Sequence, residues 1–174
     1  MEELTEQPST KQIVLKWGLI SGVISSLTSL ITYIVGITNS SMTILGTVIA
    51  IVLIILAHKE YKSDGDGFMS YGKGLGIGTL LSLVSGIVSS IVSYVYLKFV
   101  DSSYFDLLRE NQIAGMEESG LSDDQIEQAL EFSSFSFSPE FILIGVILGA
   151  VFFGFILSLI ITAFTKNSDP SAEI

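Results

Sequence analysis

The residues best suited to chemistry lie in one polar stretch of the chain, residues 58–73. Asp64, Asp66 and Gly67 have the spacing that opens a calcium-binding loop, but position 75 is Leu where such a loop needs a bidentate Glu. The Gly-Lys-Gly triplet at 72–74 lacks the Ser or Thr that follows Lys in a phosphate-binding loop. The stretch therefore predicts a turn between helices, not a metal or phosphate site.

Histidine and cysteine chemistry is equally restricted. The chain has one histidine, His58, and no cysteine. A metal centre would need further ligands, and thiol catalysis would need a nucleophile that the chain lacks. We expect His58 to end a helix as a polar residue, and the sequence predicts no catalytic residue, no metal ligand and no cofactor.

The elements that hold this stretch are strongly apolar. Of the 174 residues, 49% are hydrophobic and 15% are charged, where an ordinary soluble domain has about 25% charged residues. Residues 17–57, 74–97 and 141–165 contain no charged residue and no histidine. This segregation predicts an all-α membrane protein that crosses the bilayer several times.

The same segregation disfavours several activities. A proton or ion relay needs ionisable groups within the spans, and intramembrane proteolysis or redox catalysis would need reactive groups that these segments lack. A pore lined by Ser, Thr and backbone groups stays open as an alternative. The net charge of −10 disfavours nucleic-acid binding, which requires a basic face.

Four transmembrane helices account for the apolar runs, because one span takes about 20 residues. The first run is twice that length and contains turn-forming residues at 36–41, so it predicts a helical hairpin. A cleaved signal peptide is the alternative for its first half, but Glu2, Glu3 and Glu6 occupy the expected basic region. The predicted spans are residues 13–37, 42–57, 74–97 and 141–165.

The remaining segments divide between the two sides of the membrane. Residues 1–12, the loop at 58–73 and residues 166–174 lie on one side. With Lys16 at the start of the first span they hold six lysines, whereas the other side, mainly residues 98–140, holds Lys98 and Arg109. The positive-inside rule then places both terminal tails in the cytoplasm. Residues 98–140 form an acidic extracytoplasmic segment with ten Asp and Glu residues.

Small residues repeat at every fourth position in the spans, which favours close packing between membrane helices. Lining of a pore and contact between protomers are the alternatives. The predicted packing positions are Gly18, Gly22, Gly74, Gly78, Ser82, Gly86, Ser90, Gly145 and Gly149, with Gly46, Ala50, Ala150, Gly154 and Ser158 at similar spacing.

The first and third spans also resemble each other. Residues 19–30 align with residues 83–94, with Ser21 on Ser85, and Gly46 then falls more weakly on Gly145. Two explanations are therefore open: duplication of a helical hairpin, and chance similarity between membrane helices.

Two helices are predicted in the acidic segment, at about 103–118 and from the Ser122 cap to about Phe132, with Gly120 between them. Ser122 and Gln125 have the spacing of a capping box.

The Phe/Ser stretch at 132–137 suits a membrane surface, with a short strand as the alternative. Ser138 and Pro139 begin the last span. The scattered carboxylates predict solvated helix faces, with cation or basic-partner binding as the alternative.

Aromatic and basic residues of the loop at 58–73 are predicted to anchor it at the membrane surface. These residues are Tyr61, Lys62, Phe68, Tyr71 and Lys73.

Residues 58–62, 67–80, 96–101, 122–130 and 138–140 are similar to a known family. Together they resemble the small bacterial membrane family filed as domain of unknown function 4199, over about residues 11–166. The entry to the third span, Met-Ser-Tyr-Gly-Lys at 69–73, is the most specific part. The resemblance implies an uncharacterised four-span protein of the inner membrane, mainly of Bacteroidetes-type bacteria, and carries over no catalytic residue.

These observations predict a non-enzymatic integral membrane protein, a four-helix bundle that acts as a structural or accessory subunit through helix packing and partner contact. Its expected partners are the lipid bilayer and either a second copy or another membrane protein. The alternative is a small transporter or channel protomer that works as a homo-oligomer. An enzyme acting on lipids through loop carboxylates stands third.

Overall fold

Six α-helices and one 3-10 turn make up the computed structural model, which describes residues 9–38 and 40–168 and has no β-strand among them. The helices are α1 (Thr10–Val35), α2 (Ser41–Ser63), α3 (Tyr71–Phe99), α4 (Ser103–Glu118), α5 (Asp123–Ser133) and α6 (Pro139–Thr165), and the 3-10 turn η1 covers Ser134–Ser136. Asn39 of the first predicted loop and residues 1–8 and 169–174 of the two predicted tails lie outside the described residues.

Four of these helices, α1, α2, α3 and α6, are long and apolar enough to cross a membrane. The prediction of an all-α polytopic membrane protein is therefore confirmed. The second helix is longer than its apolar run, because it continues past Ala57 to Ser63. The expectation that His58 ends this helix is wrong: no glycine or proline follows His58 until Gly65. The turn then contains Gly67, whose φ of 84° lies in the left-handed region.

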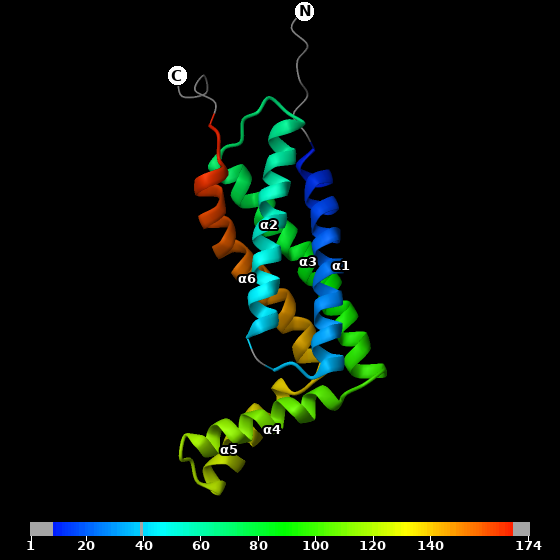
Figure 1. The fold of residues 1–174 in the computed structure, drawn as a ribbon, viewed down its shortest axis with the longest axis vertical. Coiled ribbons are helices and arrows are strands. Elements are labelled where there is room, and N and C mark those ends of the chain that lie inside the picture. The colour runs from blue at the N-terminus through cyan, green and yellow to red at the C-terminus, as the bar shows by residue number, and fades with distance from the viewer. Residues whose placement is uncertain (1–8, 39, 169–174) are drawn as a thin grey trace, which may run out of the picture.

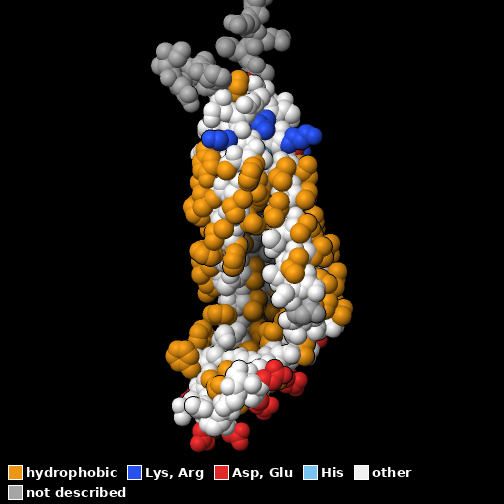
Figure 2. Space-filling view, turned by 60° about the vertical axis from the view of Figure 1, so that its left-hand side comes forward, with side chains coloured by type: hydrophobic (Ala, Val, Ile, Leu, Met, Phe, Trp, Pro, Cys, Tyr) orange, Lys and Arg blue, Asp and Glu red, His pale blue; other side chains and the backbone are white. Residues whose placement is uncertain are grey.

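The third span is the centre of the arrangement, since α3 packs against α1, α2 and α6 (Figure 1). The first helix begins and the last helix finishes at the same end of the molecule, where lysines gather. We call this end the lysine end. At the opposite end α4 and α5 carry the acidic side chains, and we call it the acidic end (Figure 2). The lysines concerned are Lys11, Lys16, Lys59, Lys62, Lys73 and Lys166.

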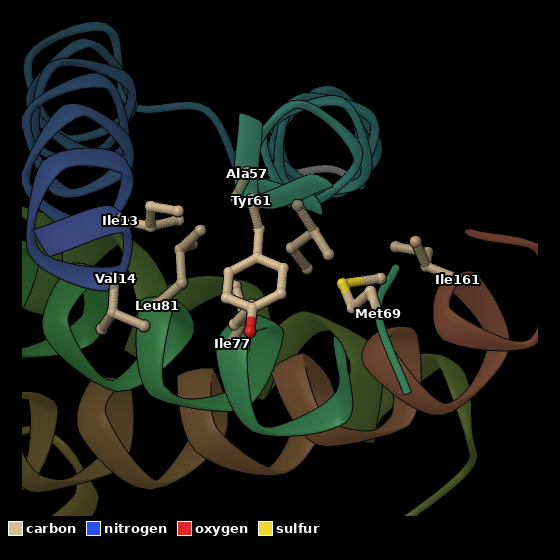
Figure 3. Packing of buried hydrophobic residues seen from close by; sticks show 9 residues of the cluster. Ile13, Val14, Ala57, Tyr61, Met69, Ile77, Leu81 and Ile161 are labelled. Atoms are coloured by element: carbon tan, nitrogen blue, oxygen red, sulfur yellow. The ribbon is translucent and has the colours of Figure 1, made fainter. Parts of the chain in front are cut away.

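The buried hydrophobic core lies at the lysine end. It joins all four long helices and includes Tyr61, which points from α2 towards α3 (Figure 3). Tyr61 is 5% exposed, so it is a core residue and not the surface anchor that the sequence predicts. The other members are Ile13, Val14, Ile54, Ala57, Met69, Ile77, Leu81 and Ile161.

The turn between α2 and α3 is tied to the chain that leaves α6. Met69 N–H donates to the Asn167 carbonyl at 2.7 Å, and Asn167 N–H donates back to the Met69 carbonyl at 3.0 Å. The Asn167 side chain also donates to the carbonyl of Gly67 at 3.0 Å. This backbone pair fixes the end of α6 against the turn that precedes α3.

Helix caps shape the acidic end. The predicted capping box is confirmed: the Ser122 side chain meets the backbone of Gln125, and the Gln125 side chain accepts from Ser122 N–H at 3.0 Å. The stretch after α5 forms the turn η1, so the strand alternative is wrong. The Ser138 side chain accepts from Phe141 N–H at 3.2 Å, and Pro139 stands in the first turn of α6.

Candidate functional site

Small residues allow α3 and α6 to touch along their length, and we call this contact the α3–α6 seam. A Cβ built on Gly86 would lie 2.7 Å from the Ala150 Cβ, a distance that real Cβ atoms essentially never show. Two more pairs are equally close, Gly78 with Ser158 and Ser82 with Gly154, and Gly74 meets Thr162 in the same way. The seam therefore admits no larger side chain at these positions.

Three serine hydroxyl groups in the seam are satisfied within their own helices, whereas the buried Thr162 hydroxyl has no hydrogen-bond partner among the described residues. Ser158 donates to the Gly154 carbonyl at 2.6 Å, and Ser82 donates to the Gly78 carbonyl at 2.9 Å. Ser90 is fully buried and donates to the Ile87 carbonyl at 2.9 Å. Each of these three hydroxyl groups is therefore paired with a carbonyl of its own helix and not with the neighbouring helix. The contact between the helices depends on shape more than on hydrogen bonds between them.

The first helix uses its small residues against α3. A Cβ on Gly18 would lie 2.7 Å from Val84, and one on Gly22 would lie 2.6 Å from Val88. Between them Ser85 donates to Ser21 at 3.0 Å. Ser21 and Ser85 are the residues that the sequence alignment pairs, so the two related segments meet at equivalent positions; the duplication itself stays a prediction.

Two of the predicted packing residues lie outside these contacts. A Cβ on Gly145 would meet only the Phe141 ring, at 4.0 Å, and one on Gly149 would meet nothing within 4 Å. The sixth helix carries two registers of small residues, and the one that faces α3 is Ala150, Gly154 and Ser158. Because neighbouring residues in a helix point about 100° apart, turning one register towards α3 turns the other away.

A buried histidine joins α2 to α3 and α6. His58 has no exposed surface, and its Nε2 lies 2.9 Å from the carbonyl of Gly74. A carbonyl only accepts, so Nε2 carries the hydrogen and Nδ1 faces the Thr165 hydroxyl at 2.8 Å. Lys62 adds a bond from Nζ to the Thr165 carbonyl at 2.8 Å. Both ring nitrogens are thus engaged in holding helices together.

A second tie joins α1 and α2 at the lysine end. The Glu60 carboxylate accepts from Lys16 Nζ at 2.6 Å and from Trp17 Nε1 at 3.1 Å. Lys16 also lies 5.4 Å from the centre of the Trp17 ring. This tie and the core cluster hold the two helices together at this end of the molecule.

Towards the acidic end α1 and α2 separate, and a cleft of about 440 Å³ opens between α1, α2 and α6. Ser21, Ser25 and Ser29 line it from α1, and Gly46 and Thr43 line it from α2. A Cβ on Gly46 would meet nothing within 4 Å, so the small residue of α2 faces open space. None of the residues lining the cleft carries a charge.

The outer end of the cleft is covered by α4. Tyr104 lines the cleft and donates to the carbonyl of Ile37 at 3.3 Å, and its ring lies 4.8 Å from that of Tyr33. Burial raises the pKa of the Tyr104 phenol above its ordinary value of 10.0. Tyr33 in turn donates to Ser93 at 3.1 Å, so these rings connect α1, α3 and α4.

The acidic segment beyond the cleft is open to solvent. One of its carboxylates, Glu140, forms an ion pair with Lys98 at 2.6 Å. Asp101 accepts from Ser103 N–H at 2.8 Å, and this bond lowers the pKa of its carboxyl below the ordinary value. Within residues 9–38 and 40–168 no three acidic, His or Cys side chains come close enough to hold a metal ion.

The sequence reasoning did not find two features of this site, the His58 junction and the cleft. The sequence pattern that could have indicated the His58 junction is a polar residue that directly follows an apolar run, with no helix-breaking residue next to it. The cleft has no linear signal, because its lining comes from four separate elements of the chain.

A set of long apolar helices with small-residue contacts defines the chain as a multi-pass membrane protein. A family model described as protein of unknown function (DUF4199) matches residues 16–167, and the chain belongs to this family. The family resemblance of the sequence is thereby confirmed. No curated protein and no solved structure matches the chain.

Proposed function

We propose that the protein is a non-enzymatic subunit of a bacterial inner membrane that contacts a partner through α4 and α5. The observation that carries the proposal is the position of these two helices, which extend beyond the four long helices and present acidic side chains to solvent (Figures 1 and 2). A structural or accessory role needs such an accessible contact surface in addition to a stable membrane part.

Charge supports a basic partner surface. Asp123, Glu127 and Glu131 follow one another at four-residue spacing on α5, all exposed, and none forms an ion pair within the described chain. Side chains at this spacing share one helix face. We call the three residues the α5 acidic stripe. A partner with lysines or arginines at matching spacing would neutralise it, and association would weaken with salt.

A non-enzymatic role is supported by the way the reactive groups are used. Both nitrogens of the single histidine bond to neighbouring helices. The charged side chains of the described chain lie mainly at its two ends, and none lines the cleft.

Both terminal tails are proposed to lie in the cytoplasm, because the lysine end carries six lysines. Single cysteines at Ser63 and Ser122 test this, since the chain has no native cysteine. An impermeant thiol reagent should label Ser122→Cys in intact spheroplasts and Ser63→Cys only after permeabilisation. Labelling of Ser63→Cys in intact spheroplasts would reverse the orientation.

The decisive experiment is the native mass of the protein after gentle extraction from its host into lipid nanodiscs, with co-purifying chains identified. We expect a foreign subunit in fixed ratio. Asp123→Asn with Glu127→Gln and Glu131→Gln should release it. A matched triple change on α4 outside the groove that these three residues line, Asp106→Asn with Glu110→Gln and Glu118→Gln, should retain it.

The competing function is a transporter or channel protomer, and the observation that favours it is the cleft between α1, α2 and α6. A closed homo-oligomer without a foreign chain would overturn the accessory role in favour of this alternative. Solute flux in liposomes would then identify the transported species.

A further inference from the structure

We infer that the cleft between α1, α2 and α6 binds one uncharged amphipathic lipid taken from the surrounding bilayer. Its hydroxyl or carbonyl head lies against the hydroxyls of α1, and its apolar part lies along Ile142 and Val146 of α6. This binding site is independent of the α5 acidic stripe and goes beyond the proposed function.

Hydrogen-bonding capacity in the cleft is the first argument. The lining hydroxyls of Thr28 and Thr32 donate to carbonyls of their own helix, at 3.0 Å and 2.9 Å. Ser25 and Ser29 line the same face and make no hydrogen bond within the described chain. In the hydrocarbon region there is little water to satisfy such groups, so a ligand with acceptor oxygens is favoured there.

Charge and size select the class of ligand. The cleft is lined by hydroxyl, small and apolar side chains from α1, α2, α4 and α6 without a charged one, so an ionised headgroup would have no counter-charge. Its volume of about 440 Å³ lies within the range of about 300–1,000 Å³ that is typical of small-molecule pockets. A neutral lipid head with ester or hydroxyl oxygens meets both conditions.

The route of entry is the third argument. Tyr104 and Leu108 of α4 cover the acidic end of the cleft, which separates it from the solvent on that side. Small and apolar residues of α2 and α6, among them Gly46 and Val146, line its flanks, and Figure 2 shows a groove between the long helices on one face. A molecule dissolved in the bilayer can therefore enter sideways.

The test uses a photoactivatable diacylglycerol in nanodiscs, with the labelled peptides identified by mass spectrometry. We expect labelling of wild-type protein on residues of α1 and α2 that line the cleft, and competition by unlabelled diacylglycerol at least tenfold stronger than by phosphatidylglycerol. Equal competition by the anionic lipid, or labels confined to the outward faces of the helices, would contradict the inference.

Three variants locate the site. Gly46→Leu fills the cleft where a side chain meets no atom, and should reduce labelling at least tenfold while the protein stays folded. Gly76→Leu is the matched control, because Gly76 also faces open space but does not line the cleft, and its labelling should equal the wild type.

Ser25→Ala with Ser29→Ala removes the two unpaired hydroxyls at almost constant volume and should lower labelling several-fold. Unchanged labelling in Gly46→Leu would overturn the inference. If Gly46→Leu changes the native mass of the complex but leaves lipid labelling at the wild-type level, the cleft binds a protein helix and not a lipid. That result would also overturn the inference. Loss of the foreign subunit from the α5 variant bears on the proposed function alone.

Discussion

The two halves of the membrane part differ in how their helices pair. In the second half, α3 and α6 touch from Gly74 to Gly86, whereas in the first half α1 and α2 are joined at the lysine end and separate towards the acidic end. If Gly46 is aligned with Gly145, Ile51 and Ile55 occupy the positions that Ala150 and Gly154 take in α6. A small residue therefore brings two helices together only where it faces the neighbouring helix, as Gly154 does and Gly46 does not.

A substitution in the α3–α6 seam tests whether the two halves differ, and it should give the largest difference in stability between them. Gly78→Val places a branched side chain against Ser158, and we expect the free energy of unfolding to fall by about 2–3 kcal/mol through overpacking. Gly46→Val is the matched change in the first half and should cost less than about 0.5 kcal/mol, since it meets no atom. Unfolding of both variants in mixed micelles measures the difference; equal losses would mean that the halves do not differ.

His58 tests how the first half is attached to the second. His58→Ala removes the bond to the Gly74 carbonyl and the contact with the Thr165 hydroxyl, and it creates a cavity, so we expect a loss of about 2–4 kcal/mol. His58→Gln can still donate to the Gly74 carbonyl and should lose about half as much. Unfolding in the same micelles checks this order, and the reverse order would show that the hydrogen bonds contribute little.

The ion pair at the lysine end should have a smaller effect. Because Lys16 is partly exposed, its coupling to Glu60 should be about 0.5 kcal/mol and should decrease with salt. A double-mutant cycle with Lys16→Met and Glu60→Gln measures the coupling. A value above about 2 kcal/mol would mean that this pair, and not the core cluster, holds α1 to α2.

The smallest effect concerns the start of α4, which covers the cleft. The pKa of Asp101 is lowered by the Ser103 bond, so its contribution is present above the ordinary pKa of 3.8 and is lost as pH falls through the lower folded value. We expect the Ser103 amide resonance to move only below about that pH. Asp101→Asn keeps an acceptor but does not titrate, so its Ser103 resonance should stay unchanged over the same range.

Much of the fold follows directly from the sequence, because uncharged runs set the spans and local spacing sets the caps at Ser122 and Ser138. Packing was harder to predict, since α6 carries two small-residue registers and only tertiary contact selects the one at Gly154. The partners of His58 were beyond sequence reasoning for a related reason. Thr165 lies 107 residues further along the chain, and no local pattern connects them.

That separation has a consequence for biosynthesis. Membrane helices leave the ribosome in order, so His58 enters the bilayer long before Thr165 has been translated, and its ring is fully paired only when the last helix has docked. A chain that stops early keeps an unsatisfied polar group in lipid, which distinguishes incomplete from complete protein. Docking of α6 is therefore the step that completes the hydrogen bonding of the imidazole.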